Sequence, residues 1–262
     1  MAGPPCRSDL KTYDTSRWGI DFLADNPTVR DKRFGMPPEA KAVRYPIRLL
    51  RYWFGYQLLR EECARAGRPV SVAEIGVHRG QMLEFVKSAP GGVSWSRWTA
   101  IDAVMLTEKL KVAGYEEFFE ANLEDRGFAL PGTYDCAVLL HVLEHLFEPE
   151  AALEKIAARI VPGGSLIGGF PVVPGAFEKI REKQVRRNAG PLGHVSVFSP
   201  ARVRRMAREA GLVPEFSSGA FFLRSKGSPL ENSAAWLRFN LYWGRLFPGW
   251  PGEIYWLMRK PT

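Results

Sequence analysis

The sequence predicts an α/β fold in which helices cover both faces of a seven-stranded, mostly parallel sheet. From residue 70 onward, short apolar runs alternate with segments whose apolar residues recur at helical spacing. Strands that alternate with helices favour a parallel sheet, because a helical crossover returns the chain to the starting edge. The chain has 262 residues, 46% of them hydrophobic and 24% charged. It can therefore bury a core without disulfides or metal clusters.

The seven expected strands are short apolar runs between turn-forming residues. They are Val70–Glu74, Trp98–Asp102, Phe118–Leu123, Asp135–Leu140, Ser165–Phe170, Glu215–Leu223 and Ile254–Arg259. The helices expected between them are Gln81–Ser88, Thr107–Ala113, Pro149–Ile160, 176–187 and Pro200–Ala210, the last with Gly211 as its C-cap. Ligands of such sheets bind at the carboxyl ends of the strands, so the functional residues are expected in the loops there.

Two helical additions flank this core. Residues 1–66 are expected to form an N-terminal arm and helix packed on the domain 67–262, with an irregular arm over 1–40. The helix is expected over Ala40–Ala66, with Pro46 in its first turn, where a missing N–H costs little. Before the last strand, the aromatic segment Ser233–Phe247 predicts a helical insertion.

Composition excludes several classes of protein. Residues 160–177 carry no charge, but five Gly and three Pro among them argue against a transmembrane helix. The N-terminus lacks the apolar core of a signal peptide, which predicts a cytoplasmic protein. Cys6, Cys63 and Cys136 are odd in number and irregularly spaced, which argues against a disulfide framework and a thiolate zinc site.

The positive charge is concentrated in one window. The net charge is 36 − 28 = +8, and between Glu178 and Arg205 eight basic residues face two acids. Such a run indicates either a solvated face or a site for an anionic partner, such as a phosphorylated substrate, a lipid surface or nucleic acid.

A glycine loop follows the first strand. Its spacing, from Glu74 to Gly76 and Gly80, is Gly-x-x-x-Gly with a preceding acid, and it differs from the Gly-x-Gly-x-x-Gly of diphosphate-binding turns. The Glu74 carboxylate suits a cationic amino group and opposes a diphosphate, which disfavours a nicotinamide-dependent oxidoreductase. Asp102, at the end of the second strand, is well placed to accept hydrogen bonds from ribose hydroxyls.

The fourth strand leads directly into a loop bearing His141, Glu144 and His145. This His-x-x-Glu-His spacing also occurs in zinc peptidases, but there it needs a helix, whereas here it follows a buried strand. Before the fifth strand, the chain turns at Val161-Pro162-Gly163-Gly164.

In this order, the motifs resemble those of class I S-adenosylmethionine-dependent methyltransferases, a Rossmann-like superfamily, and within it the small-molecule, ubiquinone-biosynthesis-type enzymes. The matching pieces are the Glu74–Gly80 loop, Asp102, the Tyr134–Leu146 segment with its Val-Leu-Glu-His, and the Pro-Gly-Gly turn. The resemblance covers about residues 70–215.

The resemblance implies S-adenosyl-L-methionine as the cofactor and a role for each matching residue. Glu74, Gly76 and Gly80 would line its methionine and ribose portions. Asp102 would hold the ribose hydroxyls, with Ala103 or Val104 beside the adenine. Leu123 and Glu124 would flank the adenine edge, and Leu140 and His141 would close the floor near the sulfonium.

Methyl transfer to a hydroxyl needs alignment and benefits from a general base, for which histidine is the usual residue. His194, before the late helix, is the first candidate and His141 the second, although a structural role for His194 is the alternative. His145 is expected to hold the Glu144 loop, and His78 to occupy a variable loop position. Some relatives bind a divalent metal through an acid at the place of His141, together with Glu144 and His145. Since this chain has His141 there, no metal is expected.

The predicted function is methylation, by O-methylation in preference to N- or C-methylation, of a small molecule or glycan. The aromatic C-terminus and the basic window together suit an anionic or lipid-linked acceptor and peripheral membrane contact. The alternative for the aromatic segment is that it packs on the core. A nucleic-acid methyltransferase is disfavoured, because no RNA-binding appendage and no Pro-Pro-aromatic motif after strand four is present. A catalytically silent cofactor-binding or scaffold protein is the other alternative, and the oligomeric state is left open.

Overall fold

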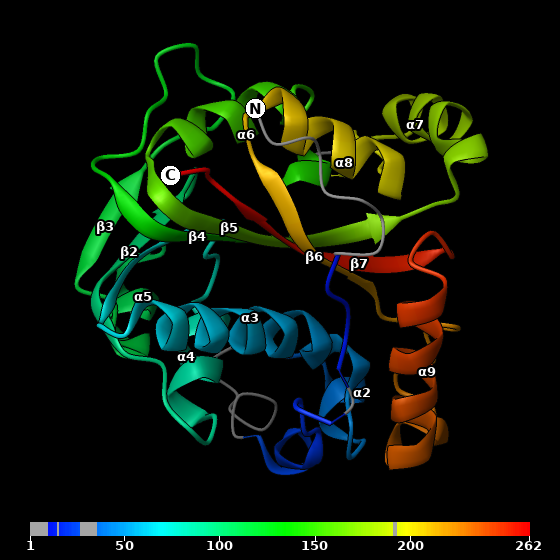
Figure 1. Ribbon diagram of the computed structural model, residues 1–262. Helices are drawn as coiled ribbons and strands as arrows, with labels where there is room; N and C mark the ends of the chain where they lie inside the picture. Colours follow the sequence, from blue (N-terminus) through cyan, green and yellow to red (C-terminus); the bar gives the residue numbers. More distant parts are fainter. Residues whose placement is uncertain (1–9, 15, 27–35, 191–192) are drawn as a thin grey trace.

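The computed structural model describes residues 10–14, 16–26, 36–190 and 193–262. Its centre is a seven-stranded sheet in the order β3-β2-β1-β4-β5-β7-β6 (Figure 1). The strands are β1 (Val70–Ile75), β2 (Trp95–Asp102), β3 (Glu117–Glu120), β4 (Tyr134–Leu140), β5 (Ile160–Val172), β6 (Val213–Gly219) and β7 (Gly252–Arg259). Strands β1 to β5 pair in parallel, whereas β7 runs antiparallel to both β5 and β6. The seven-stranded, mostly parallel sheet is thus confirmed.

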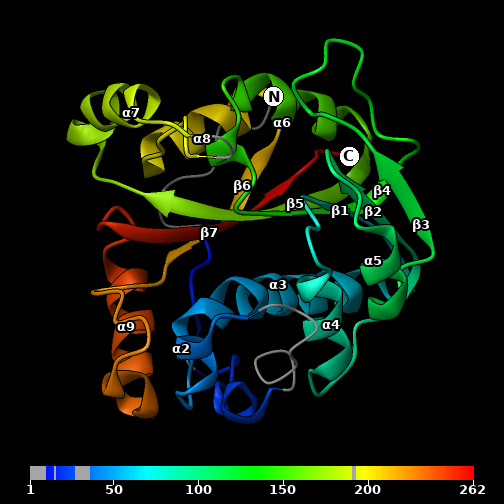
Figure 2. The ribbon, with the colours of Figure 1, turned by 180° about the vertical axis from the view of Figure 1, so that it is seen from behind.

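Helices lie on both faces of this sheet (Figures 1 and 2). On one face are α3 (Leu50–Ala66), α4 (Gln81–Ser88) and α5 (Thr107–Ala113), and on the other are α6 (Pro149–Ala158) and α8 (Pro200–Glu209). The remaining α-helices are α2 (Pro38–Lys41), α7 (Glu178–Arg187) and α9 (Ala234–Leu246). Short 3-10 segments are η2 (Asp21–Asp25), η4 (Ile47–Leu49), η5 (Leu143–His145), η6 (Gly175–Phe177) and η7 (Pro229–Asn232).

The strand order reverses between β1 and β4. From β1 the chain adds β2 and β3 on one side, and it then returns to place β4 on the other side of β1. The loops that leave β1 and β4 therefore diverge at their carboxyl ends, and such a switch point opens a crevice in a parallel sheet. This crevice is where the expected site residues lie.

The N-terminal helix begins later than expected. Residues 42–46 are not helical, Pro46 precedes η4 with an extended backbone (φ −63°, ψ 117°), and α3 starts at Leu50. Helical geometry is disfavoured for the residue before a proline, here Tyr45. A regular helix therefore does not continue from Tyr45 into Pro46. Expectations for residues 1–9, 15 and 27–35 of the arm, Cys6 included, lie outside the described residues.

Two expected strands end earlier than the sequence suggested. β3 stops at Glu120, so Leu123 and Glu124 lie in the loop beyond it. β6 stops at Gly219, where a Cβ would come within 2.8 Å of the Gly244 carbonyl oxygen in α9. The chain leaves the sheet at the point where α9 packs closely against it, although the apolar run of the sequence continues to Leu223. By contrast, α8 begins and ends nearly as expected, with Ser199 accepting from the Arg202 N–H and Gly211 following with φ +68°.

The helical insertion before the last strand is α9, and only one of its faces packs on the protein. Leu237 and Leu241 are buried, whereas Tyr242 and Leu246 are about half exposed. Trp243 and Trp250 pack with Phe222 in an aromatic cluster beside this helix. In the described residues, no helix is both long enough and apolar enough to span a membrane.

Part of the basic window is internal to the fold. Arg202 is buried and bonds to Glu150 and Glu182, and it lies over the Phe198 ring. Arg186 pairs with Glu182 and donates to the Val195 carbonyl. These arginines join α6, α7 and α8, so the window is less available to an anionic partner than its sequence charge suggested.

An arginine near the C-terminus ties α3 to the antiparallel edge of the sheet. Arg259 in β7 makes two hydrogen bonds to Glu62 (2.7 and 2.8 Å) and two to Glu215 (2.6 and 2.7 Å). Glu62 is buried, and burial alone would raise its pKa, but hydrogen bonds from Arg259 and Arg65 hold that pKa below its usual value.

We expect Arg259→Met to lower the free energy of unfolding by about 3 kcal/mol, because it leaves the buried Glu62 carboxylate without its main partner. Urea denaturation at pH 7 measures the loss, with Lys111→Met at an exposed ion pair as the control. The contribution of Glu62 should be present above its unfolded pKa and decline as the pH falls through its lower folded value. Equal stability of the two variants would contradict this.

Candidate active site

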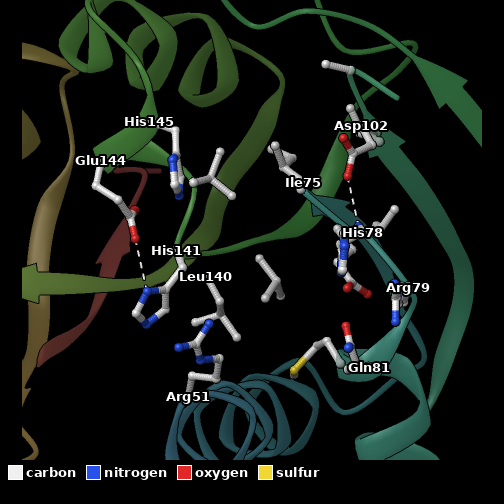
Figure 3. Close-up of a pocket in the computed structure, with 18 of the residues that line it drawn as sticks. Arg51, Ile75, His78, Arg79, Gln81, Asp102, Leu140, His141, Glu144 and His145 are labelled. Atoms are coloured by element: carbon white, nitrogen blue, oxygen red, sulfur yellow. Dashed lines mark hydrogen bonds and ion pairs between the residues drawn. The ribbon is translucent and has the colours of Figure 1, made fainter. Parts of the chain in front are cut away.

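A cavity of about 1090 Å³ lies at the carboxyl ends of β1, β2 and β4. Most residues singled out by the sequence line it: Glu74, Gly76, Asp102, Ala103, Val104, Leu123, Glu124, Leu140, His141, His145 and His194. Figure 3 shows two ends, one with Asp102, His78 and Arg79 and the other with Arg51, His141, Glu144 and His145. After the roles expected from the sequence, the first group is named the cofactor end and the second the acceptor end.

The loop after β1 is shaped for a close backbone approach. Gly76 has φ +73°, and a Cβ there would come within 2.4 Å of the Val142 side chain. Its N–H donates to the Ile101 carbonyl oxygen (2.8 Å). His78 also has a positive φ, and its N–H donates to Asp102 Oδ2 (2.8 Å; Figure 3). Only glycine suits the first of these positions, and it leaves the cavity floor without a side chain.

Asp102 is held in place by backbone amides. Besides the His78 N–H, the Val104 N–H donates to Oδ1 (3.2 Å). The carboxylate therefore stands at the end of β2 in one orientation, and each oxygen keeps a lone pair that can accept from a hydroxyl.

Gly80 lies outside the cavity lining. It is the N-cap of α4 with φ +77°, and a Cβ there would come within 2.9 Å of Ala113 and of Tyr115. The glycine at this position allows α4 to pack tightly against α5, and it does not form part of the cavity wall. The spacing of the two glycines could not separate these roles.

Glu74 is a buried carboxyl group at the cofactor end. Its Oε2 accepts from Trp98 Nε1 (2.8 Å) and from the Tyr115 hydroxyl (2.5 Å). Burial raises the pKa of Glu74 to about 7, although both hydrogen bonds oppose that rise. A cation bound in the cavity would favour its ionised form.

At the acceptor end, His141 is placed between two buried carboxyl groups. It has a positive φ, which turns the chain out of β4, and its own N–H donates to the Gly169 carbonyl oxygen (2.7 Å). Nδ1 lies 3.0 Å from Glu144 Oε1 (Figure 3), and Nε2 lies 3.4 Å from Glu253 Oε2. Burial alone would lower the pKa of His141, but these two carboxyl groups raise it.

Three charged residues that the sequence analysis did not name meet beside His141. Arg51 comes from α3, Arg224 from the segment after β6, and Glu253 from β7. The guanidinium groups lie 3.9 Å and 2.8 Å from Glu253 Oε1. Burial opposes the charge of Glu253, but His141, Arg51 and Arg224 hold its pKa far below the usual range. For Arg51 and Glu253, the signal that the sequence offered was a charged residue within an otherwise apolar helix or strand.

His145 and His194 complete this end. Their rings meet edge to face with centroids 4.9 Å apart, and His145 Nδ1 lies 3.2 Å from the Gly193 carbonyl oxygen. Partial burial lowers the pKa of His194, although Glu144 opposes that shift. Ligand atoms of Glu144, His145 and His194 lie within 4.8 Å of one another, close enough to hold a divalent ion. The sequence predicted no metal, and it did not bring His194 into this group. Residues 191–192 of its loop lie outside the description.

The fold and the cavity define a Rossmann-like enzyme that binds a nucleoside cofactor at the switch point of its sheet. The model of the family described as "Methyltransferase domain" matches residues 47–215, more than half of the chain. The chain therefore belongs to this family and is an S-adenosylmethionine-dependent methyltransferase. The matched residues include α3, which the sequence analysis had assigned to a separate N-terminal region.

Solved structures are similar in fold at low sequence identity. The [4+2]-cyclase SpnF is 14% identical, covers all of both chains and has a TM-score of 0.55. An O-methyltransferase family protein from Burkholderia thailandensis is 14% identical over 93% of this chain and 64% of its own, with a TM-score of 0.54. N-methyltransferase NodS from Bradyrhizobium japonicum, in complex with S-adenosylhomocysteine, is 16% identical over 92% and 91%, with a TM-score of 0.49. A search of the curated proteins finds no match.

The raised pKa of Glu74 makes the stability of the free protein depend on pH. Its folded pKa, about 7, lies above the ordinary value of 4.5. Between these values the native state keeps a proton that the unfolded chain releases, so the free energy of unfolding falls as the pH rises. Relative to Glu74→Gln, the wild type should lose about 3 kcal/mol from pH 4 to pH 8.

Urea denaturation across this pH range measures the difference between the two proteins. Glu116→Gln, at an exposed carboxyl group, is the matched control and should follow the wild type. Parallel stability curves for wild type and Glu74→Gln would show that Glu74 does not titrate in this way.

Proposed function

We propose that this methyltransferase transfers a methyl group to a hydroxyl of a small molecule, with His194 as the general base. The observation that carries this proposal is the state of the histidines at the acceptor end. His194 lines the cavity, and partial burial lowers its pKa from the ordinary value, which favours the neutral imidazole that can accept a proton.

The residues of the cofactor end fit S-adenosylmethionine. The ionised Glu74 carboxyl would pair with the amino group of its methionine portion, and Asp102 would accept hydrogen bonds from the ribose hydroxyls. Ala103, Leu123 and Glu124 would surround the adenine, and the glycine surface at Gly76 would admit the methionine portion. The carboxylate of that portion requires a cation, and Arg48 and Arg79 line this cavity.

The acceptor end would orient the hydroxyl and take up its proton. When bound, the cofactor supplies a methyl group on a sulfonium, which needs little activation beyond alignment. His194 would accept the hydroxyl proton. His141, the second candidate base, is better described as a positioning residue, because both of its ring nitrogens face carboxyl groups. Leu140 would close the floor beside it.

A small-molecule or glycan acceptor fits the cavity volume of about 1090 Å³, and an O-methyltransferase family protein is among the structures similar in fold. A lipid-linked acceptor with peripheral membrane contact is supported by the exposed side of α9, where Tyr242 and Leu246 lie near Arg238 and Arg245 in sequence. A silent cofactor-binding protein would bind S-adenosylmethionine without turning it over.

We expect Asp102→Ala to weaken the binding of S-adenosylmethionine and S-adenosylhomocysteine by about tenfold or more, because the ribose loses a charged acceptor. Calorimetric titration of both ligands measures the change. Asp135→Ala, whose carboxylate pairs with Arg68 elsewhere on the sheet, is the control for loss of an aspartate. Unchanged affinity in Asp102→Ala would remove Asp102 from the proposed site.

We expect His194→Gln to lower the turnover number by about a hundredfold or more while the affinity for S-adenosylhomocysteine stays unchanged. In the wild type, activity should fall as the pH drops through the lowered pKa of His194. Screening a panel of phenols, sugars and hydroxy acids for formation of S-adenosylhomocysteine supplies the assay. Arg181→Gln on the exposed helix α7 is the control. Full activity in His194→Gln with an unaltered pH profile would exclude His194 as the base.

A further inference from the structure

Two guanidinium groups meet at one carboxylate in the acceptor end. Arg51 and Arg224 lie 3.9 Å and 2.8 Å from Glu253 Oε1. The Arg51 and Glu253 side chains are only 17% and 2% exposed. A charge in such a poorly hydrated place is costly unless opposite charge compensates it, and the single carboxylate of Glu253 is shared between two guanidinium groups.

Arg51 has unused hydrogen-bond donors in this place. Its Nε is buried and has no hydrogen-bond partner within the described part of the chain. Its ion pair with Glu253, at 3.9 Å, is longer than a hydrogen bond. The Arg51 guanidinium can therefore donate hydrogen bonds to an anionic ligand without losing one to Glu253.

Arg224 is more accessible than Arg51. It is 45% exposed and lies 2.8 Å from Glu253, in the segment that follows β6. Both arginines line the cavity, together with His194. A buried and a half-exposed guanidinium that share one carboxylate can hold an entering anion between them.

We propose that Arg51 and Arg224 form an oxyanion subsite, and that the methyl acceptor is an acid that places a carboxylate or phosphate group there. The inference rests on the proposed function only in calling the ligand an acceptor. The planar guanidinium matches both kinds of oxyanion with paired hydrogen bonds. Glu253 keeps the two arginines in position while the subsite is empty. The acceptor would be fixed by its charged group, with its hydroxyl directed toward His194.

Anion binding to the full-length protein saturated with S-adenosylhomocysteine tests this subsite. The probes are inorganic phosphate, benzoate and its neutral isostere benzamide, titrated by calorimetry at constant ionic strength. Phosphate or benzoate should bind saturably and benzamide should not, and the two anions distinguish a phosphate from a carboxylate acceptor. No saturable binding of either anion, or displacement of S-adenosylhomocysteine by the anion, overturns the proposal.

Four variants locate the binding. Arg51→Gln and Arg224→Gln should each weaken the binding of the anion by about tenfold or more, whereas Arg181→Gln, on the exposed helix α7, should not. Glu253→Gln removes the internal competitor and should strengthen anion binding, a gain that a purely structural network would not produce. Weaker binding in Glu253→Gln, or an equal loss in all three arginine variants, contradicts the subsite.

Thermal melting checks that each variant is folded. If Arg51→Gln does not fold, Arg51→Lys replaces it, because lysine keeps the positive charge. Arg51→Lys should retain part of the affinity for the anion. Repeating the anion titration without S-adenosylhomocysteine separates the two proposals. If the cofactor product does not bind but the anion still does, the proposed function fails and the subsite stands.

Discussion

The geometry of the site depends on the turn that closes β1 onto β2. Gly76 and His78 both adopt positive φ there, and their N–H groups bond to Ile101 and Asp102 of the neighbouring strand. This turn holds the Asp102 carboxylate at the cavity and keeps a side chain away from the floor, where Val142 leaves no room for a Cβ. A methyltransferase works mainly by aligning the methyl group with the atom that accepts it. A turn with a fixed backbone therefore helps by holding the groups that line the cavity in one arrangement.

The two ends of the cavity use charge in different ways. At the cofactor end, Glu74 is buried with neutral donors, so its charge appears only when a cation or a high pH favours it. At the acceptor end, the permanent charges of Arg51 and Arg224 meet the single carboxylate of Glu253. One cavity is therefore suited to a cationic amino group at one end and to an anion at the other.

Segments outside the parallel βα units contribute three charged residues to the acceptor end. α3 contributes Arg51, the segment between β6 and α9 contributes Arg224, and the antiparallel strand β7 contributes Glu253. The connection from β6 to β7 also carries the aromatic cluster of Phe222, Trp243 and Trp250, in which Phe222 lies close in sequence to Arg224. These three charged residues therefore come from parts of the chain other than the loop after β4 that carries His141 and Glu144.

The sequence by itself determined the fold class, the methyltransferase family and many of the residues that line the cavity, because strand periodicity, the Gly76 turn and an acid at the end of β2 are local features of the chain. It placed Gly80 in the site, although that glycine serves the packing of α4, since spacing alone does not separate a turn that meets a ligand from one that meets a helix. The charged group around His141 was decided only by the tertiary structure. Arg51 and Glu253 are some two hundred positions apart, and only the pairing of β7 with β5 brings them together.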